Sequence, residues 1–223
     1  MTTPTAVPRP AAARPALTRA LAAAFLLAAA VDLGSLLAGA DTGHLIAKPL
    51  LMPLLAAYAA TLGAPRLLLA ALLLGWGGDV LLLLDGDAAF LAGMGSFALG
   101  HLCYLALFGR RRTSPALGAL YAAALAGTLT ALWPDLPADL RIPVAGYSLL
   151  LAATACRAGS LGVLAGTGGA LFLLSDTLIA TGIAGWPALP APDFWVMLTY
   201  LAAQSLLTAG ILRAGRLGAS DVR

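Results

Sequence analysis

Long apolar segments occupy almost the whole chain and recur at short intervals. They cover residues 17–38, 45–62, 65–85, 88–109, 115–133, 142–157, 160–183 and 193–212. A helix that crosses the hydrocarbon core of a bilayer needs about 20 mostly apolar residues, and most of these segments approach that length. The sequence therefore predicts an all-α, polytopic membrane protein, built as a bundle of eight transmembrane helices.

The composition excludes other classes of protein. Hydrophobic residues make up 61% of the 223 residues and charged residues only 10%, whereas soluble domains usually carry about 25% charged residues. The net charge of +3 comes from arginines in short loops without interleaved aromatic residues, which argues against a nucleic-acid partner. Cys103 and Cys156 lie inside apolar segments, and we expect them to pack as small hydrophobic residues.

The distribution of basic residues predicts the topology. If the N-terminus is cytoplasmic, every lysine and arginine except Lys48 and Arg141 faces the cytoplasm, as the positive-inside rule requires. We expect a disordered cytoplasmic arm over 1–15, the transmembrane domain over 16–213 and a cytoplasmic tail over 214–223. Residue usage rich in Ala, Leu, Gly and Arg is typical of a high-GC bacterium, so we expect an integral protein of a bacterial plasma membrane with both termini cytoplasmic.

The first two segments carry local signals that need interpretation. Residues 38–40 resemble a signal-peptidase site, but the preceding segment is longer than a usual signal h-region and contains Asp32, so we favour a retained helix. Lys48 and Pro49 open the second segment, and Pro53 follows. Proline near a first helical turn is tolerated, because the missing N–H would be unpaired there anyway.

Two aspartates stand out because they lie within apolar segments. A carboxylate inside a bilayer costs about 2.5–3.5 kcal/mol even on lenient scales, and both Asp79 and Asp176 are in this position. We expect Asp79 about six residues from the outer end of its span, roughly 9 Å deep, with Asp176 and Lys48 on the same side. Gly75, Gly77 and Gly78 would let another group approach Asp79 closely.

Two neighbouring carboxyls suggest acid–base chemistry. Mutual repulsion in a low-dielectric bundle favours one protonated and one ionised carboxyl near neutral pH, which is the arrangement of a general acid beside a general base. The sequence contains no Gly-x-Ser-x-Gly, His-Glu-x-x-His or phosphate-loop motif, and no metal signature or cofactor is expected. Purely structural roles remain open for three residues. Asp32 could form a hydrogen bond between helices, and Lys48 could extend its side chain to the membrane surface. His101 could be a histidine packed in the core.

The same local pattern occurs twice. Gly78-Asp79 and Ser175-Asp176 are four predicted helices apart, as are Lys48-Pro49 and the segment from Arg141 to Pro143. An even offset would relate two parallel four-helix repeats, which we state as a hypothesis.

Short motifs in these segments resemble the lysoplasmalogenase family of YhhN-like integral membrane proteins. They are Lys48-Pro49-Leu50, Gly78-Asp79, the segment 97–104 with His101 and Tyr104, Tyr147, the segment 169–176 ending in Ser175-Asp176, and the segment 200–204 from Tyr200 to Gln204. They occur in the expected order over nearly the whole chain. The first predicted helix and both tails carry no matching motif.

The resemblance implies a hydrolase that cleaves the vinyl-ether bond of lysoplasmalogens, or of a related lysolipid, without a metal or organic cofactor. The products would be a fatty aldehyde and a glycerophospho-head group. Asp79 and Asp176 would be the catalytic acid and base, with a lysophospholipid as substrate. The substrate-binding residues would be Lys48, His101, Tyr104, Tyr147, Ser175, Tyr200 and Gln204. Two alternatives remain at this point, a small proton-coupled transporter or channel that uses the same buried acids and a structural membrane subunit. The oligomeric state stays open.

Overall fold

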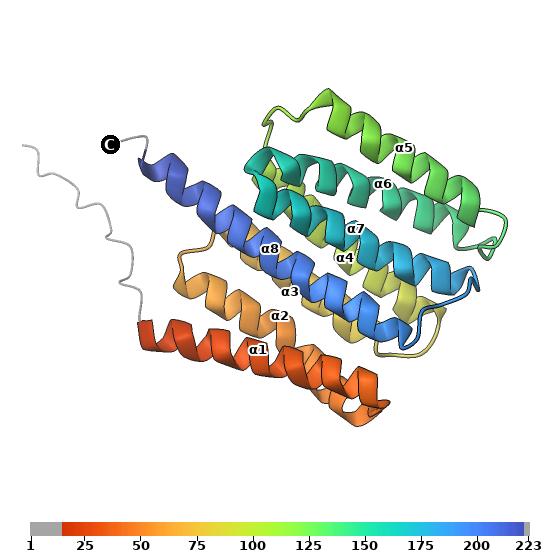
Figure 1. The fold of residues 1–223 in the computed structure, drawn as a ribbon, viewed down its shortest axis with the longest axis horizontal. Coiled ribbons are helices and arrows are strands. Elements are labelled where there is room, and N and C mark those ends of the chain that lie inside the picture. The colour runs from red at the N-terminus through yellow and green to blue at the C-terminus, as the bar shows by residue number, and fades with distance from the viewer. Residues whose placement is uncertain (1–14, 221–223) are drawn as a thin grey trace, which may run out of the picture.

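The computed structural model describes residues 15–220, and its described part consists of eight α-helices without a strand (Figure 1). They are α1 (Pro15–Ala38), α2 (Asp41–Thr61), α3 (Arg66–Leu81), α4 (Asp87–Phe108), α5 (Pro115–Leu132), α6 (Arg141–Ala158), α7 (Val163–Ile183) and α8 (Pro192–Ser220), with a short 3₁₀ helix, Gly159–Leu161, after α6. The predicted eight-helix fold is confirmed. The arm expected over 1–15 lies outside the described residues except for its last position.

Successive helices run up and down, so the described chain begins and ends at the same end of the bundle (Figure 1). We call this the arginine end, because its helix termini and loops carry Arg19, Arg66, Arg110, Arg111, Arg112, Arg157, Arg213 and Arg216. The opposite end carries the α1–α2, α3–α4, α5–α6 and α7–α8 loops. Helix α8 packs on α7 and also touches α1 and α2, whereas α5 packs on α6 at the periphery.

Seven of these helices are long and apolar enough to cross a membrane, which identifies an integral membrane protein. The exception is α3, whose 16 residues span about 24 Å of a hydrocarbon core about 30 Å thick. The apolar segment predicted to continue to residue 85 turns after Leu81, and Gly86, with a φ of 103°, directly precedes α4. Asp79 therefore lies two residues from the end of its helix instead of the six expected from the sequence.

The two prolines of α2 lie in its interior, so the expectation that Pro49 falls near the first turn was wrong. The helix begins at Asp41, before the expected start at residue 45. Because Pro53 has no N–H, the carbonyl of Pro49 loses its helical hydrogen bond. Trp76 Nε1 of α3 donates to that carbonyl at 2.9 Å. The carbonyl that is left unpaired within α2 thus accepts a hydrogen bond from α3 and links the two helices.

Glycines allow the closest helix contacts. A Cβ at Gly78 of α3 would lie 2.5 Å from the ring of Phe97 of α4, and a Cβ at Gly168 of α7 would lie 2.7 Å from the backbone nitrogen of Leu207 of α8. Contacts of α2 with α3 and α3 with α4 are repeated by α6 with α7 and α7 with α8. This recurrence is compatible with the four-helix repeat, which stays a hypothesis. Helix α8 also continues to Ser220, so most of the expected tail is helical.

Candidate active site

A cavity lies between α2, α3, α4, α6, α7 and α8, and its volume is about 750 Å³ when the open solvent at its mouth is included. Both predicted acids, Asp79 and Asp176, line it. Its walls are otherwise mainly apolar, and their larger side chains are Leu82, Phe90, Met94, Phe97, Val144, Leu151, Ile179 and Ile183. The cavity therefore combines a small polar centre with surfaces that suit a hydrocarbon chain.

Asp79 lies in the last turn of α3 and is 2% exposed. Its Oδ2 accepts a hydrogen bond of 2.8 Å from the hydroxyl of Tyr200 on α8. A Cβ at Gly75, one turn earlier, would lie 3.3 Å from that hydroxyl and 3.2 Å from Nε2 of Gln204. The absence of a side chain at Gly75 thus leaves space for the polar groups that reach Asp79.

Asp176 lies on α7 and is held in a similar way. Its Oδ2 accepts a hydrogen bond of 2.5 Å from the hydroxyl of Tyr147 on α6. The neighbouring Ser175 also lines the cavity, but its hydroxyl donates to the carbonyl of Val196 on α8 at 3.0 Å. Each acid is therefore oriented through one oxygen by a tyrosine from another helix, and the described residues provide no hydrogen bond to its other oxygen.

Lys48 of α2 is half-buried and lines the same cavity. It lies within electrostatic reach of both Asp79 and Asp32. Of the described residues that line this cavity, Lys48 is the one cation. Its position gives the cavity a group that can bind an anionic substituent of a ligand.

Tyr104 and Gln204 lie behind the cavity wall. The hydroxyl of Tyr104 on α4 donates to Oε1 of Gln204 on α8 at 2.6 Å, and Gln204 Nε2 contacts the Tyr200 hydroxyl at 3.5 Å. Because Tyr200 donates to Asp79, a buried chain of polar groups runs from α4 through α8 to α3. These two residues support the site without lining it.

His101 also lies outside the cavity lining. It is 2% exposed, and neither ring nitrogen has a hydrogen-bond partner among the described residues. Its ring packs edge-on against Phe172 with centroids 4.4 Å apart, and it contacts the rings of Tyr104 and Tyr147. This environment is that of a core aromatic residue, and it places His101 behind the wall that carries Tyr147.

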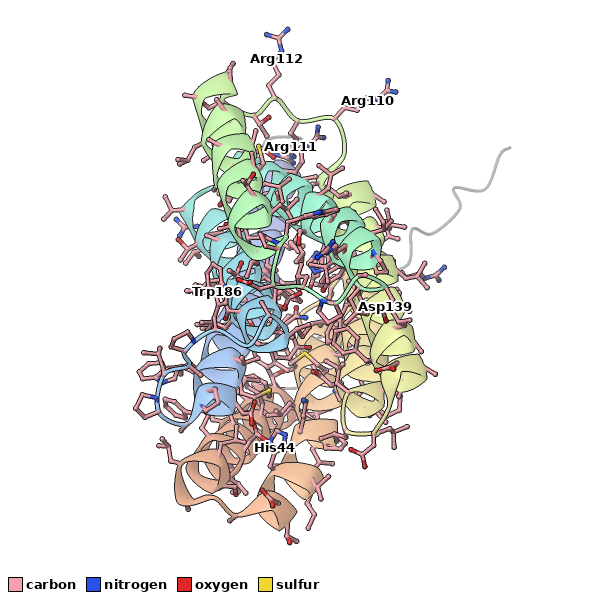
Figure 2. The ribbon with its side chains drawn as sticks, turned by 90° about the vertical axis from the view of Figure 1, so that its right-hand side faces the viewer. His44, Arg110, Arg111, Arg112, Asp139 and Trp186 are labelled. Carbon is pink, nitrogen blue, oxygen red and sulfur yellow. The ribbon has the colours of Figure 1, made fainter. Side chains whose placement is uncertain are left out.

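His44, at the start of α2, was not among the residues predicted for the site. Its Nδ1 lies 2.8 Å from Oδ1 of Asp32, which is fully buried in α1 (Figure 2). His44 and Lys48 are four residues apart on one helix and so share a face, a spacing that could have revealed the pair. Asp32 thus links α1 to α2 and does not line the cavity. The described residues contain no cluster of three or more His, Cys, Asp or Glu that could hold a metal ion.

Fold and site together define a class: an all-helical, polytopic membrane protein with two tyrosine-bound carboxyls in a cavity within its bundle. A family model described as the YhhN family matches residues 43–211. The chain belongs to the YhhN family, which confirms the resemblance stated from the motifs. The match includes every residue predicted for the site and begins after Asp32.

Proteins named lysoplasmalogenase are similar to this chain. A human one, TMEM86B, is 38% identical over 152 residues, which cover 68% of this chain and 66% of the human protein. One from Mycobacterium bovis is 36% identical over 194 residues, covering 76% of this chain and 72% of that protein. A pig TMEM86B is 39% identical over 130 residues, 58% of this chain and 57% of the relative. No solved structure matches the chain significantly.

Proposed function

We propose that this protein is a membrane-embedded hydrolase that cleaves the vinyl-ether bond of lysoplasmalogens, giving a fatty aldehyde and a glycerophospho-head group. The observation that carries the proposal is a pair of carboxyls, the buried Asp79 and the partly buried Asp176, that line one largely apolar cavity. Membership of a family with relatives named lysoplasmalogenase supports the choice of substrate.

Two carboxyls are sufficient for this reaction. The protonated carboxyl delivers its proton to the vinyl carbon remote from the ether oxygen, which leaves an oxocarbenium ion. The ionised carboxyl stabilises this cation and takes a proton from the attacking water. The resulting hemiacetal breaks its C–O bond, so that the glycerol oxygen leaves with a proton and the aldehyde is released. Either Asp79 or Asp176 can fill either role.

The surrounding groups have distinct tasks in this proposal. Tyr200 and Tyr147 hold the two carboxyls through one oxygen each and leave the other oxygen for substrate and water. Lys48 binds the head-group phosphate, while the apolar walls hold the hydrocarbon chain. His101, Tyr104 and Gln204, which we expected to contact substrate, would instead support the site from behind.

The decisive experiment measures aldehyde release from lysoplasmenylethanolamine by the protein purified in detergent. Asp79→Asn and Asp176→Asn should each lower kcat by a factor of about 100 or more, because each removes one partner of the acid–base pair. Asp139→Asn is the matched control, since Asp139 is exposed on the α5–α6 loop (Figure 2) and should keep full activity. Activity that survives both cavity substitutions would refute the proposed pair.

Substrate analogues separate this activity from its alternatives. A lysolipid with a saturated alkyl ether has no vinyl carbon to protonate and should not be turned over. Equal hydrolysis of an acyl lysolipid would contradict vinyl-ether specificity. A proton-coupled transporter would consume no substrate in detergent, where no compartments exist, so turnover there also separates an enzyme from that alternative.

We also propose the orientation. The arginine end would face the cytoplasm of a bacterial plasma membrane, with both ends of the described chain on that side. The positive-inside rule supports this orientation, because eight arginines of the described helices and loops lie at that end.

A further inference from the structure

A second hollow lies further along α8 than the candidate active site, toward the arginine end. It is a groove between α1, α2 and α8 at the arginine end, with a volume of about 1110 Å³ when the open solvent at its mouth is included. Its lining residues are Ala22, Phe25 and Leu26 of α1, Leu55, Tyr58 and Leu62 of α2, and Ser205, Thr208, Ala209, Leu212, Arg213 and Arg216 of α8. It shares no lining residue with the acid-bearing cavity, so the mechanism does not use it.

The shape of this groove follows from the spacing of its residues. On each of the three helices they recur at intervals of three or four, so one face of each helix forms a wall. From Ser205 to Arg216 the α8 wall is about 16 Å long. Most of the lining is aliphatic or aromatic, and Leu26 is 66% exposed. In a membrane protein such a groove is in contact with lipid chains.

Charge is concentrated at one end of the groove. Arg213 and Arg216 are exposed, lie three residues apart on one face of α8, and form no ion pair with an acid within the described part of the chain. Guanidinium groups bind phosphate through paired hydrogen bonds. The groove therefore presents an apolar wall that ends in two phosphate-binding groups at the membrane surface.

We propose that this groove binds an anionic diacyl phospholipid, with one acyl chain along α1, α2 and α8 and its phosphate on Arg213 and Arg216. Two arginines without a lining acid leave a net positive charge at the groove mouth. This charge favours a head group that lacks the compensating amine of a zwitterionic lipid. The ligand is thus a structural lipid of the bilayer, distinct from the lysolipid substrate of the cavity.

Native mass spectrometry of the full chain in detergent tests this site, with added phosphatidylglycerol and phosphatidylcholine of identical acyl chains. We expect wild-type protein to retain phosphatidylglycerol preferentially. Arg213→Gln with Arg216→Gln should weaken its binding about thirtyfold, and Ala209→Trp should displace the acyl chain by filling the groove. Arg110→Gln with Arg112→Gln is the control, because it removes the same charge from side chains that project outward from the α4–α5 loop (Figure 2).

Four results would overturn the proposal. Equal retention of both lipids would remove the charge selectivity, and an equal loss in the Arg110 and Arg112 control would show non-specific attraction to the arginine end. Binding that Ala209→Trp leaves intact would place the lipid outside the groove. A wild-type dimer that Ala209→Trp abolishes would assign the groove to a second copy of the chain. Retained folding of each variant is checked by its thermal unfolding in the same detergent.

Discussion

At the scale of single residues, each of the two carboxyls in the cavity accepts a hydrogen bond from a tyrosine hydroxyl on one oxygen. Tyr200 donates to Asp79 and Tyr147 to Asp176. These bonds fix the rotamer of each carboxyl and so fix where its other oxygen points. In the proposed mechanism such positioning matters more in the transition state than in substrate binding.

Removing either hydroxyl should therefore impair turnover. We expect Tyr200→Phe and Tyr147→Phe each to lower kcat about 10- to 100-fold with a much smaller change in KM, because a hydrogen bond to a charged group is worth about 1.5–3 kcal/mol. Steady-state kinetics on lysoplasmenylethanolamine measures this. Tyr121→Phe on the peripheral helix α5 is the control and should behave as wild type. An increase in KM alone would instead assign the tyrosines to substrate binding.

The buried pair of Tyr104 and Gln204 allows a stability prediction of a different kind. Gln204→Leu strands the Tyr104 hydroxyl, which is 1% exposed, and should lower the free energy of unfolding by about 1–3 kcal/mol. Combining it with Tyr104→Phe should recover part of this loss, since both partners then become apolar. Thermal unfolding in detergent tests the double-mutant cycle, and strictly additive effects would show that the bond contributes little.

At the scale of helices, the bond from Trp76 to Pro49 compensates for the proline in α2. Trp76→Phe keeps an aromatic ring but leaves the Pro49 carbonyl unpaired where no water can replace the donor. We expect a loss of about 1–3 kcal/mol in unfolding free energy. Trp133→Phe is a matched control, because Trp133 is 38% exposed against 39% for Trp76 and its indole N–H has no hydrogen-bond partner among the described residues. Equal melting temperatures for the two variants would contradict this role.

The contact of α7 with α8 gives a second test at this scale. A Cβ at Gly168 would lie 2.7 Å from Leu207 N and 2.9 Å from Ala203 O, and rigid backbone cannot give way as a flexible side chain can. Gly168→Ala should therefore force the helices apart and cost about 1–3 kcal/mol. Gly182→Ala on the same helix meets nothing within 4 Å and should be neutral or stabilising by up to about 1 kcal/mol. Chemical unfolding in detergent compares them, and equal effects would refute the packing argument.

Hydropathy was sufficient to locate the helices, since each apolar segment ends at charged, glycine or proline residues. It failed at α3, because leucines continue through the turn after Leu81 and give no compositional signal. Asp79 and Asp176 could be found because each interrupts an apolar segment. Their tyrosine partners could not be paired with them, since that requires the rotation of each helix. Helices that face lipid on one side and a core on the other are apolar all round, so periodicity does not reveal their rotation.

At the scale of the whole molecule, basic and acidic residues lie at opposite ends of the bundle. The arginine end carries eight basic residues among the described helices and loops, whereas the opposite end carries acidic loop residues such as Asp135 and Asp139. Trp186 of the α7–α8 loop donates to Asp135 at 2.7 Å and links two loops there (Figure 2). The cavity with Asp79 and Asp176 opens between helices nearer this acidic end, while the proposed lipid groove lies at the other.

This asymmetry predicts a single orientation in the membrane. In a variant with Cys103 and Cys156 replaced by alanine, Asp139→Cys should react with a membrane-impermeant maleimide in intact cells. Arg111→Cys should react only after permeabilisation, because the arginine end faces the cytoplasm in the proposed orientation. Each arginine on the cytoplasmic side contributes about 1 kcal/mol of attraction to anionic lipid. One helix, α5, separates the loops that carry these two residues, so the loops lie on opposite faces whatever the orientation. The reverse labelling pattern would therefore invert the molecule and move the phosphate-binding groove to the outer leaflet.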